Sequence, residues 1–489
     1  MKTTGISRRT FVKAAAVGTA AWLGGDVARK VAAAKEPLRS PHNVLIITTD
    51  QQRVDAMSAA GNKWAKTPHM DSIAANGVYF HRSYCSYPLC SPSRGSLHTG
   101  RTPHEIGVDR NSLPIDPGIT ISGQVFKAAG YDTGYSGKWH LPNPYPADGI
   151  AGFEVLNKGQ RKGNLAEVVD KGTMNQAIEF LKRKREKPFY LVVSFINPHD
   201  ICLLAGETSP LLDKVMERYM PDEGAELPPL PKNFPPPAGA SDFLTKRLKH
   251  PQWDENHWRR YRYAYFRMME DVDRQIGKVL DALREIGQED NTLVIFTSDH
   301  GEGLACHHWT GKMMYFEGEA AVPLIVSFKG VTPAGRIDKD HLVTTLDVLP
   351  TICDYAGLKP PEKMRGESLR GVIERPDSPG HEFVVSEMAN GPAGRSFMVR
   401  TKRYKYMCFP GSQPPEMLFD LDADPDEMKN IGSDEALASE MARHRKLLAE
   451  WRQLTDEAGH HVKPAAETPK GRRKAKAAGQ AKVATNRKQ

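Results

Sequence analysis

The strongest chemical signal in the chain is a cysteine followed closely by a proline and an arginine. Cys90 opens the segment Cys-Ser-Pro-Ser-Arg-Gly-Ser-Leu-His-Thr-Gly-Arg, which ends at Arg101. Proline is favoured in the first turn of a helix, so we expect a loop that enters a helix near Cys90. The free amides of a first turn favour an anion beside them, and the planar guanidinium of Arg94 suits an oxyanion. The segment therefore predicts an anion site with a cysteine at its centre.

Two short apolar runs of the same design each end in residues that could bind a metal. One run ends in Asp50-Gln51 and the other in Asp299-His300. β-Branched runs of this length predict buried parallel strands, and ligands bind at the carboxyl edge of such sheets. Carboxylate and amide oxygens suit a hard divalent cation such as Ca²⁺ or Mg²⁺. The simpler interpretation is that the two aspartates only cap strand ends.

Three further segments carry side chains that could contact a substrate. Lys138 and His140 lie in Gly-Lys-Trp-His-Leu, His199 follows Asn-Pro, and Lys312 follows His-His-Trp-Thr-Gly. A lysine can hold an oxyanion as a point charge, and a histidine can donate a hydrogen bond or a proton. A lone lysine or histidine is more often a surface or structural residue. The functional interpretation therefore depends on the presence of the other segments in the same chain.

Together these segments resemble the type I sulfatases of the alkaline-phosphatase superfamily. The family motif Cys-x-Pro-Ser-Arg, followed by Thr-Gly-Arg, is matched from Cys90 to Arg101, and similar segments extend over about residues 42–455. The resemblance implies that a formylglycine-generating enzyme oxidises Cys90 to formylglycine. One hydroxyl of the hydrated aldehyde would attack sulfur, and the other would expel sulfate as the aldehyde forms again.

The same resemblance assigns a role to each candidate residue. The residues that would hold the metal are Asp50, Gln51, Asp299 and His300, with modified Cys90. The residues that would act as nucleophile or on the sulfate and the leaving group are Cys90, Arg94, Lys138, His140, His199 and Lys312. The implied activity is hydrolysis of sulfuric esters, and the expected substrates are sulfated small molecules or polysaccharides.

The chain departs from the commoner family pattern at Gln51, where a second aspartate is usual. Calcium is the expected metal, but one carboxylate fewer lowers the negative charge of the site and leaves magnesium and manganese open. Some relatives with Asp-Gln hydrolyse phosphonate monoesters or phosphodiesters, so such a hydrolase with the same nucleophile is one alternative. A non-catalytic relative that only binds sulfate is the other.

The elements that must position these residues are those of an α/β protein. Apolar runs at 43–48, 189–195, 292–296 and 322–328 predict strands, and apolar residues at helical spacing predict a helix over 261–286. We expect a large mixed, mostly parallel sheet flanked by helices in a catalytic domain over 40–375, alkaline-phosphatase-like by the resemblance. Short strands after about residue 375 predict a smaller antiparallel sheet in a C-terminal α+β subdomain over 376–460.

The net charge of +8 is concentrated at the two ends of the chain. Residues 1–34 carry +5 and residues 463–489 carry +8, which leaves −5 for the body. A mildly acidic body argues against a nucleic-acid partner, and the basic tail at 463–489 is predicted to be disordered.

Residues 1–34 contain Ser7-Arg8-Arg9, a short apolar run and three small residues before Lys35. This order predicts a twin-arginine signal peptide, recognised by the twin-arginine export machinery, and a periplasmic or secreted protein. The apolar run is too short to span a bilayer, so no stable membrane span is expected in the mature protein.

Overall fold

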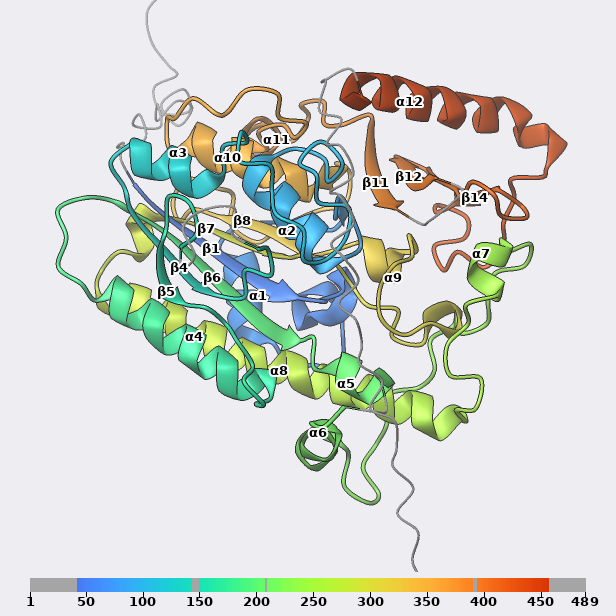
Figure 1. Cartoon of the computed structure of the whole chain (residues 1–489), viewed down its shortest axis with the longest axis horizontal. Helices are drawn as coiled ribbons and strands as arrows, with labels where there is room; N and C mark the ends of the chain where they lie inside the picture. Colours follow the sequence, from blue (N-terminus) through green and yellow to red (C-terminus); the bar gives the residue numbers. More distant parts are fainter. Residues whose placement is uncertain (1–41, 143–148, 207–208, 390–393, 457–489) are drawn as a thin grey trace, which may run out of the picture. The chain divides into compact units, whose positions relative to one another are not determined.

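The computed structural model describes residues 42–142, 149–206, 209–389 and 394–456 (Figure 1). The predicted signal peptide at 1–34 and the basic tail at 463–489 lie outside the described residues, so both stay predictions. The boundary between residues 375 and 376 also stays a prediction. In the part of the chain that is described, no helix combines the length and apolar character needed to cross a membrane. All six cysteines are free thiols.

The largest element of the fold is an eight-stranded sheet. In spatial order its strands are β5 (Glu154–Asn157), β4 (Asp132–Gly137), β6 (Phe189–Pro198), β1 (Asn43–Asp50), β7 (Thr292–Ser298), β8 (Leu324–Ser327), β2 (Val78–Phe80) and β9 (Arg336–Asp338). Neighbours pair in parallel except that β8 pairs antiparallel with both β7 and β2. The predicted mixed, mostly parallel sheet is confirmed.

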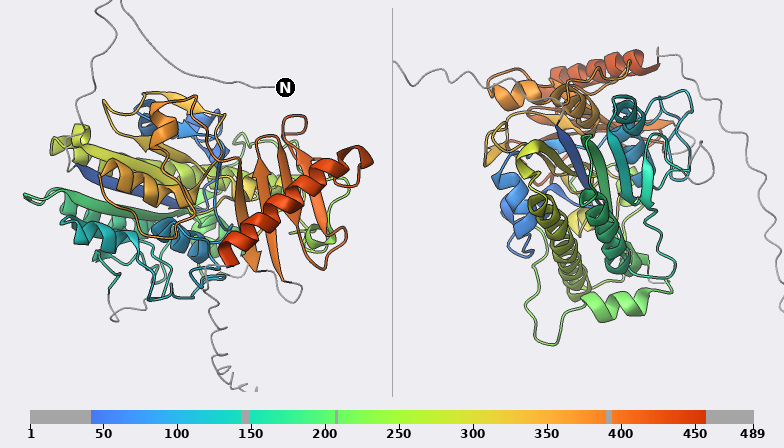
Figure 2. Two further views of the ribbon diagram at one scale, coloured as in Figure 1. Left: turned by 90° about the horizontal axis from the view of Figure 1, so that it is seen from above. Right: turned by 90° about the vertical axis from the view of Figure 1, so that its left-hand side faces the viewer.

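The central strands are buried on both faces, which explains their nearly continuous apolar sequence. Val44, Leu45, Ile46 and Ile47 of β1 are at most 1% exposed. Figures 1 and 2 show helices on both sides of the sheet. One layer contains α1 (Pro68–Ala75), α4 (Ala166–Leu181) and α8 (Glu255–Glu285), and the other contains α2 (Cys90–Thr99), α3 (Ser122–Ala128), α10 (Val348–Tyr355) and α11 (Arg370–Glu374).

Helix α8 begins six residues before the position that apolar periodicity predicts. The Asp254 side chain caps it by accepting a hydrogen bond from the His257 amide at 2.9 Å. The first turn, from Glu255, is polar and exposed except at Trp258. Its start is therefore set by the cap rather than by the apolar stripe. Shorter helices α5 (Ile201–Gly206), α6 (Leu212–Tyr219) and α7 (Asp242–Thr245) lie between β6 and α8 in the sequence.

The C-terminal region forms the predicted antiparallel sheet. Its strands are β11 (Phe383–Ala389), β12 (Arg395–Thr401), β13 (Tyr404–Cys408) and β14 (Glu416–Asp420), in sequence order. Helix α12 (Ala438–Asp456) packs on one face, with Met441 and Leu448 among the residues of a shared apolar cluster. Side-chain bonds join this sheet to the larger part of the fold, for example from Tyr315 Oη to the Ser396 carbonyl at 2.8 Å.

A buried lysine of β13 forms a second link between the C-terminal region and the part of the fold that contains the large sheet. Lys405 Nζ lies 2.6 Å from Glu317 Oε1 and 2.7 Å from Glu427 Oε1. Lys405 is 0% and Glu427 1% exposed. Glu317 begins α9 (Glu317–Ala320), which lies in the segment between β7 and β8. Because a buried carboxylate is costly without a partner, this lysine stabilises the junction.

Replacing Lys405 with methionine keeps the length of the side chain and removes its charge. We expect Lys405→Met to lower the free energy of unfolding by about 3–5 kcal/mol, because it leaves buried carboxylates without their cation. Urea unfolding followed by tryptophan fluorescence measures the change. Lys446→Met is the control, since this side chain is 77% exposed, and should change stability by less than about 0.5 kcal/mol. Equal stability of the two variants would contradict a stabilising role for Lys405.

Candidate active site

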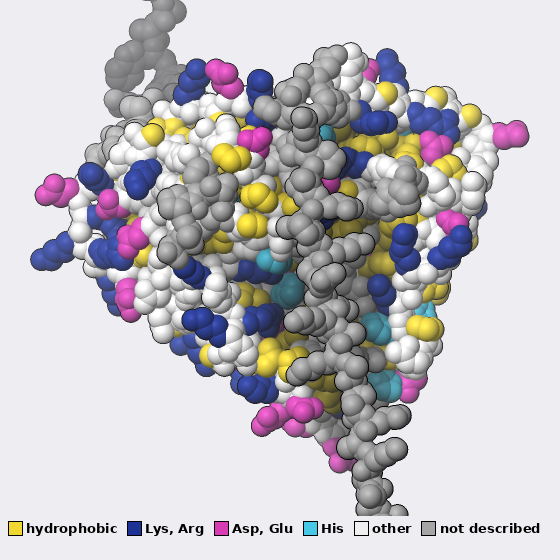
Figure 3. Space-filling model, in the orientation of Figure 1, with side chains coloured by type: hydrophobic (Ala, Val, Ile, Leu, Met, Phe, Trp, Pro, Cys, Tyr) yellow, Lys and Arg dark blue, Asp and Glu magenta, His cyan; other side chains and the backbone are white. Residues whose placement is uncertain are grey.

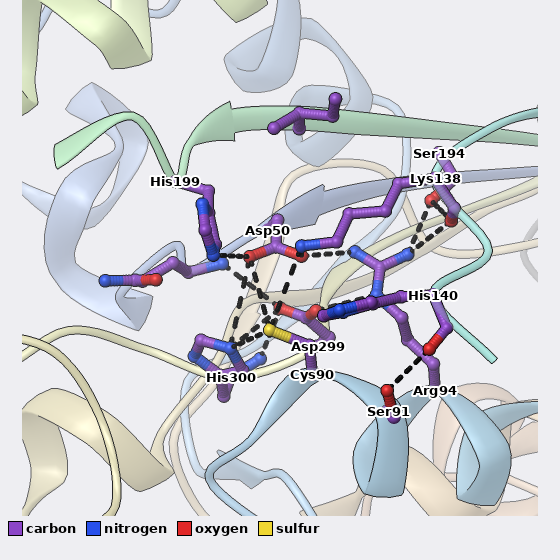
Figure 4. Close-up of polar contacts among 12 residues, drawn as sticks. Asp50, Cys90, Ser91, Arg94, Lys138, His140, Ser194, His199, Asp299 and His300 are labelled. Carbon is purple, nitrogen blue, oxygen red and sulfur yellow. Dashed lines mark hydrogen bonds and ion pairs between the residues drawn. The ribbon is translucent and has the colours of Figure 1, made fainter. Parts of the chain in front are cut away.

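The predicted residues meet where four strand ends face the start of one helix. Asp50 is the last residue of β1, and Asp299 follows β7. Lys138 follows β4, and His199 follows β6. Cys90 is the first residue of α2. Figure 4 shows their side chains converging on one point at the carboxyl edge of the sheet, which is where such sheets bind ligands.

Cys90 lies at the centre of this cluster and is 0% exposed. Its Sγ is 3.0 Å from Lys312 Nζ, 3.2 Å from His300 Nε2 and 3.8 Å from both Lys138 Nζ and Asp50 Oδ1. Burial and the Asp50 carboxylate oppose ionisation of the thiol, but the two lysines and His300 outweigh them and hold the pKa of Cys90 well below its usual range. The position is therefore built to hold a nucleophile or an anion.

Arg94 braces the two aspartates. Its Nε donates to Asp299 Oδ2 at 2.8 Å, and Nη2 donates to Asp50 Oδ2 at 2.8 Å. Its Nη1 donates to the Lys138 carbonyl at 2.8 Å and to Ser194 Oγ at 2.7 Å. Most N–H donors of the Arg94 guanidinium, which was predicted to contact an oxyanion, are therefore hydrogen-bonded within the protein.

Both aspartates are almost fully buried, but their environments differ. Burial opposes ionisation of Asp50, yet Lys138, His199 and Arg94 hold its pKa well below the usual value. Lys138 Nζ lies 2.7 Å from Asp50 Oδ2. The pKa of Asp299 is raised, by burial and by the nearby Asp50 carboxylate. A bound cation would favour the ionised form of both.

Four of the predicted metal-binding residues are close enough to share one ion. The ligand atoms of Asp50, Cys90, Asp299 and His300 all lie within 4.8 Å of one another. The fifth, Gln51, has its Oε1 3.2 Å from Lys312 Nζ, which also contacts Cys90. This oxygen-rich set with one imidazole fits a hard divalent cation.

Gln51 is fixed in both backbone and side chain. It has a left-handed φ of 72°, and its amide donates to Asp299 Oδ1 at 3.1 Å. Its Nε2 donates to Glu302 Oε2. A carboxylate can only accept, so the amide nitrogen must face Glu302 and the amide oxygen must face Lys312 and the cluster.

Glu302 is a buried residue beside this site that the sequence did not predict. It is 0% exposed and accepts hydrogen bonds from Tyr261 Oη at 2.9 Å, the Leu304 amide at 3.1 Å and the Gly311 amide at 2.6 Å. These bonds close the loop that carries Lys312. Five non-glycine residues of this loop have positive φ, namely Leu304, Ala305, His307, His308 and Met313, so the loop needs such a support. The only sequence signal was an acid three residues after Asp299.

Lys138 owes its place to the glycine before it. Gly137 has φ 112°, and a Cβ there would lie 1.9 Å from the Ser194 carbonyl oxygen. The absence of a side chain lets the Lys138 amide donate to that oxygen at 2.9 Å. This close approach of β4 to β6 turns the Lys138 side chain into the cluster.

A cavity of about 600 Å³ opens beside the cluster. Its wall includes Lys138, Trp139, His140, Arg161 and His199. Basic and histidine side chains gather near the middle of the face shown in Figure 3. Burial and the two lysines of the cluster lower the pKa of His199 to about 3, so its imidazole is neutral at neutral pH.

His140 is placed differently from the other predicted residues. Its side chain is exposed and lines the cavity, and its φ is 59°. Its backbone carbonyl accepts a hydrogen bond from Ser91 Oγ at 2.6 Å, which ties this loop to the start of α2. The catalytic role that the resemblance implies for His140 stays a prediction.

Known sulfatases are similar to this protein over most of its chain. A family model described as Sulfatase matches residues 42–358, and one described as N-sulphoglucosamine sulphohydrolase, C-terminal, matches residues 305–454. The chain is 31% identical to the Delta 4,5-hexuronate-2-O-sulfatase of Bacteroides thetaiotaomicron, over 84% of this chain and 88% of that protein.

Solved structures share the fold. A structure described as a 2-O GAG sulfatase matches with a TM-score of 0.73 and 28% identity, over 85% of this chain and 93% of that chain. The phosphonate monoester hydrolase of Agrobacterium radiobacter matches with a TM-score of 0.70 and 24% identity, over 85% and 96% of the two chains. At that identity the second match shows the shared fold alone.

The contact between Glu302 and Gln51 makes divalent-cation affinity depend on a residue outside the ligand set. We expect Glu302→Gln to weaken cation binding by about 10–100-fold, because the Gln51 oxygen is no longer forced toward the cluster. Calorimetric titration with Ca²⁺, Mg²⁺ and Mn²⁺ measures the affinities.

Glu319→Gln is a matched control for this experiment. Glu319 is also a buried glutamate of the same region, 1% exposed, and its carboxylate oxygens have no hydrogen-bond partner among the described residues. This variant should bind the cations as the unaltered protein does. If both variants bound them equally well, Glu302 would have no role in orienting Gln51.

Proposed function

The chain belongs to the sulfatase family and is a sulfuric ester hydrolase, and from this premise we propose that it desulfates carbohydrates with a formylglycine made from Cys90. The observation that carries the proposal is the position of the Cys90 thiol, which stands where the modified side chain would lie. It contacts two lysines and a histidine beside two buried aspartates. A formylglycine hydrate supplies one hydroxyl to attack sulfur and a second to expel sulfate.

The residues of the cluster divide the work on the sulfate group. Lys138 and Lys312 both contact the Cys90 sulfur and would neutralise charge on the sulfuryl oxygens. Well-placed groups of this kind are each worth roughly 10²–10³-fold in rate. His199 lies in the cavity wall beside Lys138 and is placed to donate to the oxygen that leaves with the alcohol.

We propose Ca²⁺ as the metal, with Asp50, Gln51, Asp299, His300 and the modified residue 90 as its ligands. The oxygen-rich ligand set supports this choice, and the cation titration above tests it. A bound Ca²⁺ would polarise the sulfate group and the nucleophile. Tighter binding of Mg²⁺ or Mn²⁺ than of Ca²⁺ would contradict the choice.

Sulfated carbohydrates are supported as substrates by the cavity and by the relatives. Trp139, Ile150, Val155 and Ile196 give the cavity an apolar wall next to its cations, and sugar rings pack on such walls. Two of the similar proteins are described as acting on a hexuronate and on GAG. A desulfation screen over defined sulfated sugars would identify the substrate, and activity on none of them would contradict this class.

Hydrolysis of phosphonate monoesters or phosphodiesters is a second candidate activity. The feature that favours it is Gln51, whose neutral amide replaces the usual carboxylate. Turnover of an aryl phosphonate measured beside that of an aryl sulfate separates the two. Faster turnover of the phosphonate would make the sulfatase reaction the secondary one.

The role of Cys90 gives two measurable outcomes. In protein from the native host, the peptide that contains residue 90 should be about 18 Da lighter than the cysteine peptide, because H₂S is lost and oxygen gained. Cys90→Ala should lose at least about 10³-fold in kcat, because the nucleophile is gone. Cys353→Ala, which removes a buried thiol of α10, should keep its activity. Full activity of protein with an unmodified Cys90 would exclude the formylglycine mechanism. An unmodified Cys90 in a protein without activity would favour a non-catalytic relative that only binds sulfate.

We further propose export through the twin-arginine machinery to the periplasm or the exterior. The support is the order of Arg8-Arg9, the apolar run and the small residues before Lys35. In the native host, Arg8→Lys/Arg9→Lys should keep the precursor in the cytoplasm, whereas Lys2→Ala should still be exported. Cell fractionation followed by immunoblotting measures both. Normal export of the double variant would contradict this signal.

A further inference from the structure

Arg161 lies in the cavity wall and contacts His199, the histidine for which we propose a role at the leaving oxygen. Its Nη1 pairs with Asp200 Oδ1, and its Nη2 lies 3.3 Å from His199 Nδ1. Asp200 is 0% exposed, and its second oxygen accepts the Ala166 amide at 2.7 Å. The guanidinium is thus held between a buried carboxylate and one ring nitrogen of His199.

The chemistry of a guanidinium decides which nitrogen of His199 carries the hydrogen. Every polar atom of the Arg161 guanidinium is a donor, so Nδ1 must accept and cannot carry a hydrogen. In a neutral imidazole the hydrogen is then on Nε2. Nε2 is the atom that faces the cluster, 3.8 Å from Asp50 Oδ1.

We propose that Arg161 is a positioning residue that holds His199 in its Nε2–H tautomer, so that a donor rather than a lone pair faces the leaving oxygen. This inference rests on the sulfatase function proposed above. As the hydroxyl oxygen at position 90 bonds to sulfur, it gives up its proton to water, the S–O bond to the alcohol breaks and its electron pair goes to the leaving oxygen. The His199 N–H hydrogen-bonds that oxygen, and the protonated water returns the proton that completes the alcohol.

The proposal makes Arg161 matter most for poor leaving groups. A sugar hydroxyl is a much weaker acid than a nitrophenol, so its oxygen carries more negative charge in the transition state. Hydrogen-bond donation to that oxygen then contributes more. Loss of the donor should therefore steepen the dependence of rate on the acidity of the leaving alcohol.

Arg161→Met tests this with a series of substituted phenyl sulfates. We expect kcat to fall by about 10–100-fold for phenyl sulfate, and by less than about 3-fold for nitrophenyl sulfates. The exposed neighbour Lys162 gives the control Lys162→Met, which should leave both rates unchanged. Because Arg161→Met strands the buried Asp200 carboxylate, Arg161→Met/Asp200→Asn is made as well. This pair removes both charges, and it should show the same steepening.

Two further measurements separate tautomer control from a general structural effect. In a His199→Gln background, Arg161→Met should change kcat little further, because the histidine through which Arg161 acts is gone. Nitrogen-15 NMR of histidine-labelled protein, with the His199 signals assigned by their loss in His199→Gln, should show Nδ1 without a hydrogen. That signature should be lost in Arg161→Met.

Three results would overturn the role of Arg161. They are equal rate losses across the phenyl sulfates, a full further loss in the His199→Gln background, and a hydrogen on Nδ1 in the unaltered protein. Turnover by the unaltered enzyme separates this inference from the proposed function. If it hydrolysed no sulfate ester at all, the proposed function would fail. If it hydrolysed them with a leaving-group dependence that Arg161→Met did not change, only this inference would fail.

Discussion

The structure depends on the burial of two aspartates beside one guanidinium. Asp50 and Asp299 are 0% and 2% exposed, and Arg94 binds one oxygen of each at 2.8 Å. Moving two carboxylates out of water is costly unless cations and donors replace the water. The fold supplies them by ending adjacent parallel strands β1 and β7 at the same edge and starting α2 opposite. Arg94, one turn after the start of α2, then reaches both Asp50 and Asp299.

The same constraint favours a neutral side chain at Gln51. With Asp50, Asp299 and a third carboxylate in one buried site, repulsion would be severe before a cation binds. Here the third position carries a neutral amide, and the nearest further carboxylate, Glu302, lies behind it and bonds to its nitrogen. This further negative charge thus lies behind Gln51 and not among the side chains that could bind a metal. The same Glu302 accepts hydrogen bonds from two backbone amides of the loop before Lys312, so it joins Gln51 to the loop that carries Lys312.

The sequence predicts elements that have a strong local pattern, and it misses elements and residues whose roles depend on tertiary contacts. The apolar runs of β1, β6, β7 and β8 and the four C-terminal strands were predictable, because burial on one or both faces leaves a direct pattern. Strand β4 (Asp-Thr-Gly-Tyr-Ser-Gly) has no such run, since its glycines serve close packing on β6. Arg94 was predicted to contact a substrate oxyanion, and this stays a prediction. Its direct hydrogen bonds to Asp50 and Asp299 were not predicted, because they depend on how the strand ends face α2. Glu302 and Arg161 carry no motif at all, because their roles exist only through contacts across the fold.

Glu302 and Arg161 each fix the orientation or tautomer of a neighbouring group, one by accepting hydrogen bonds and the other by donating them. An amide and a neutral imidazole each present a donor and an acceptor, so either can turn the wrong atom toward the reaction. Glu302 can only accept and therefore turns the Gln51 oxygen inward, whereas Arg161 can only donate and therefore places the His199 hydrogen inward. Each ambiguous group is paired with a partner that has no ambiguity, and each of those partners is tied to the backbone, directly or through Asp200. The polarity of the site is consequently set by hydrogen-bond complementarity before any substrate or cation arrives, which is the pre-organisation that stabilises a charged transition state without reorganisation.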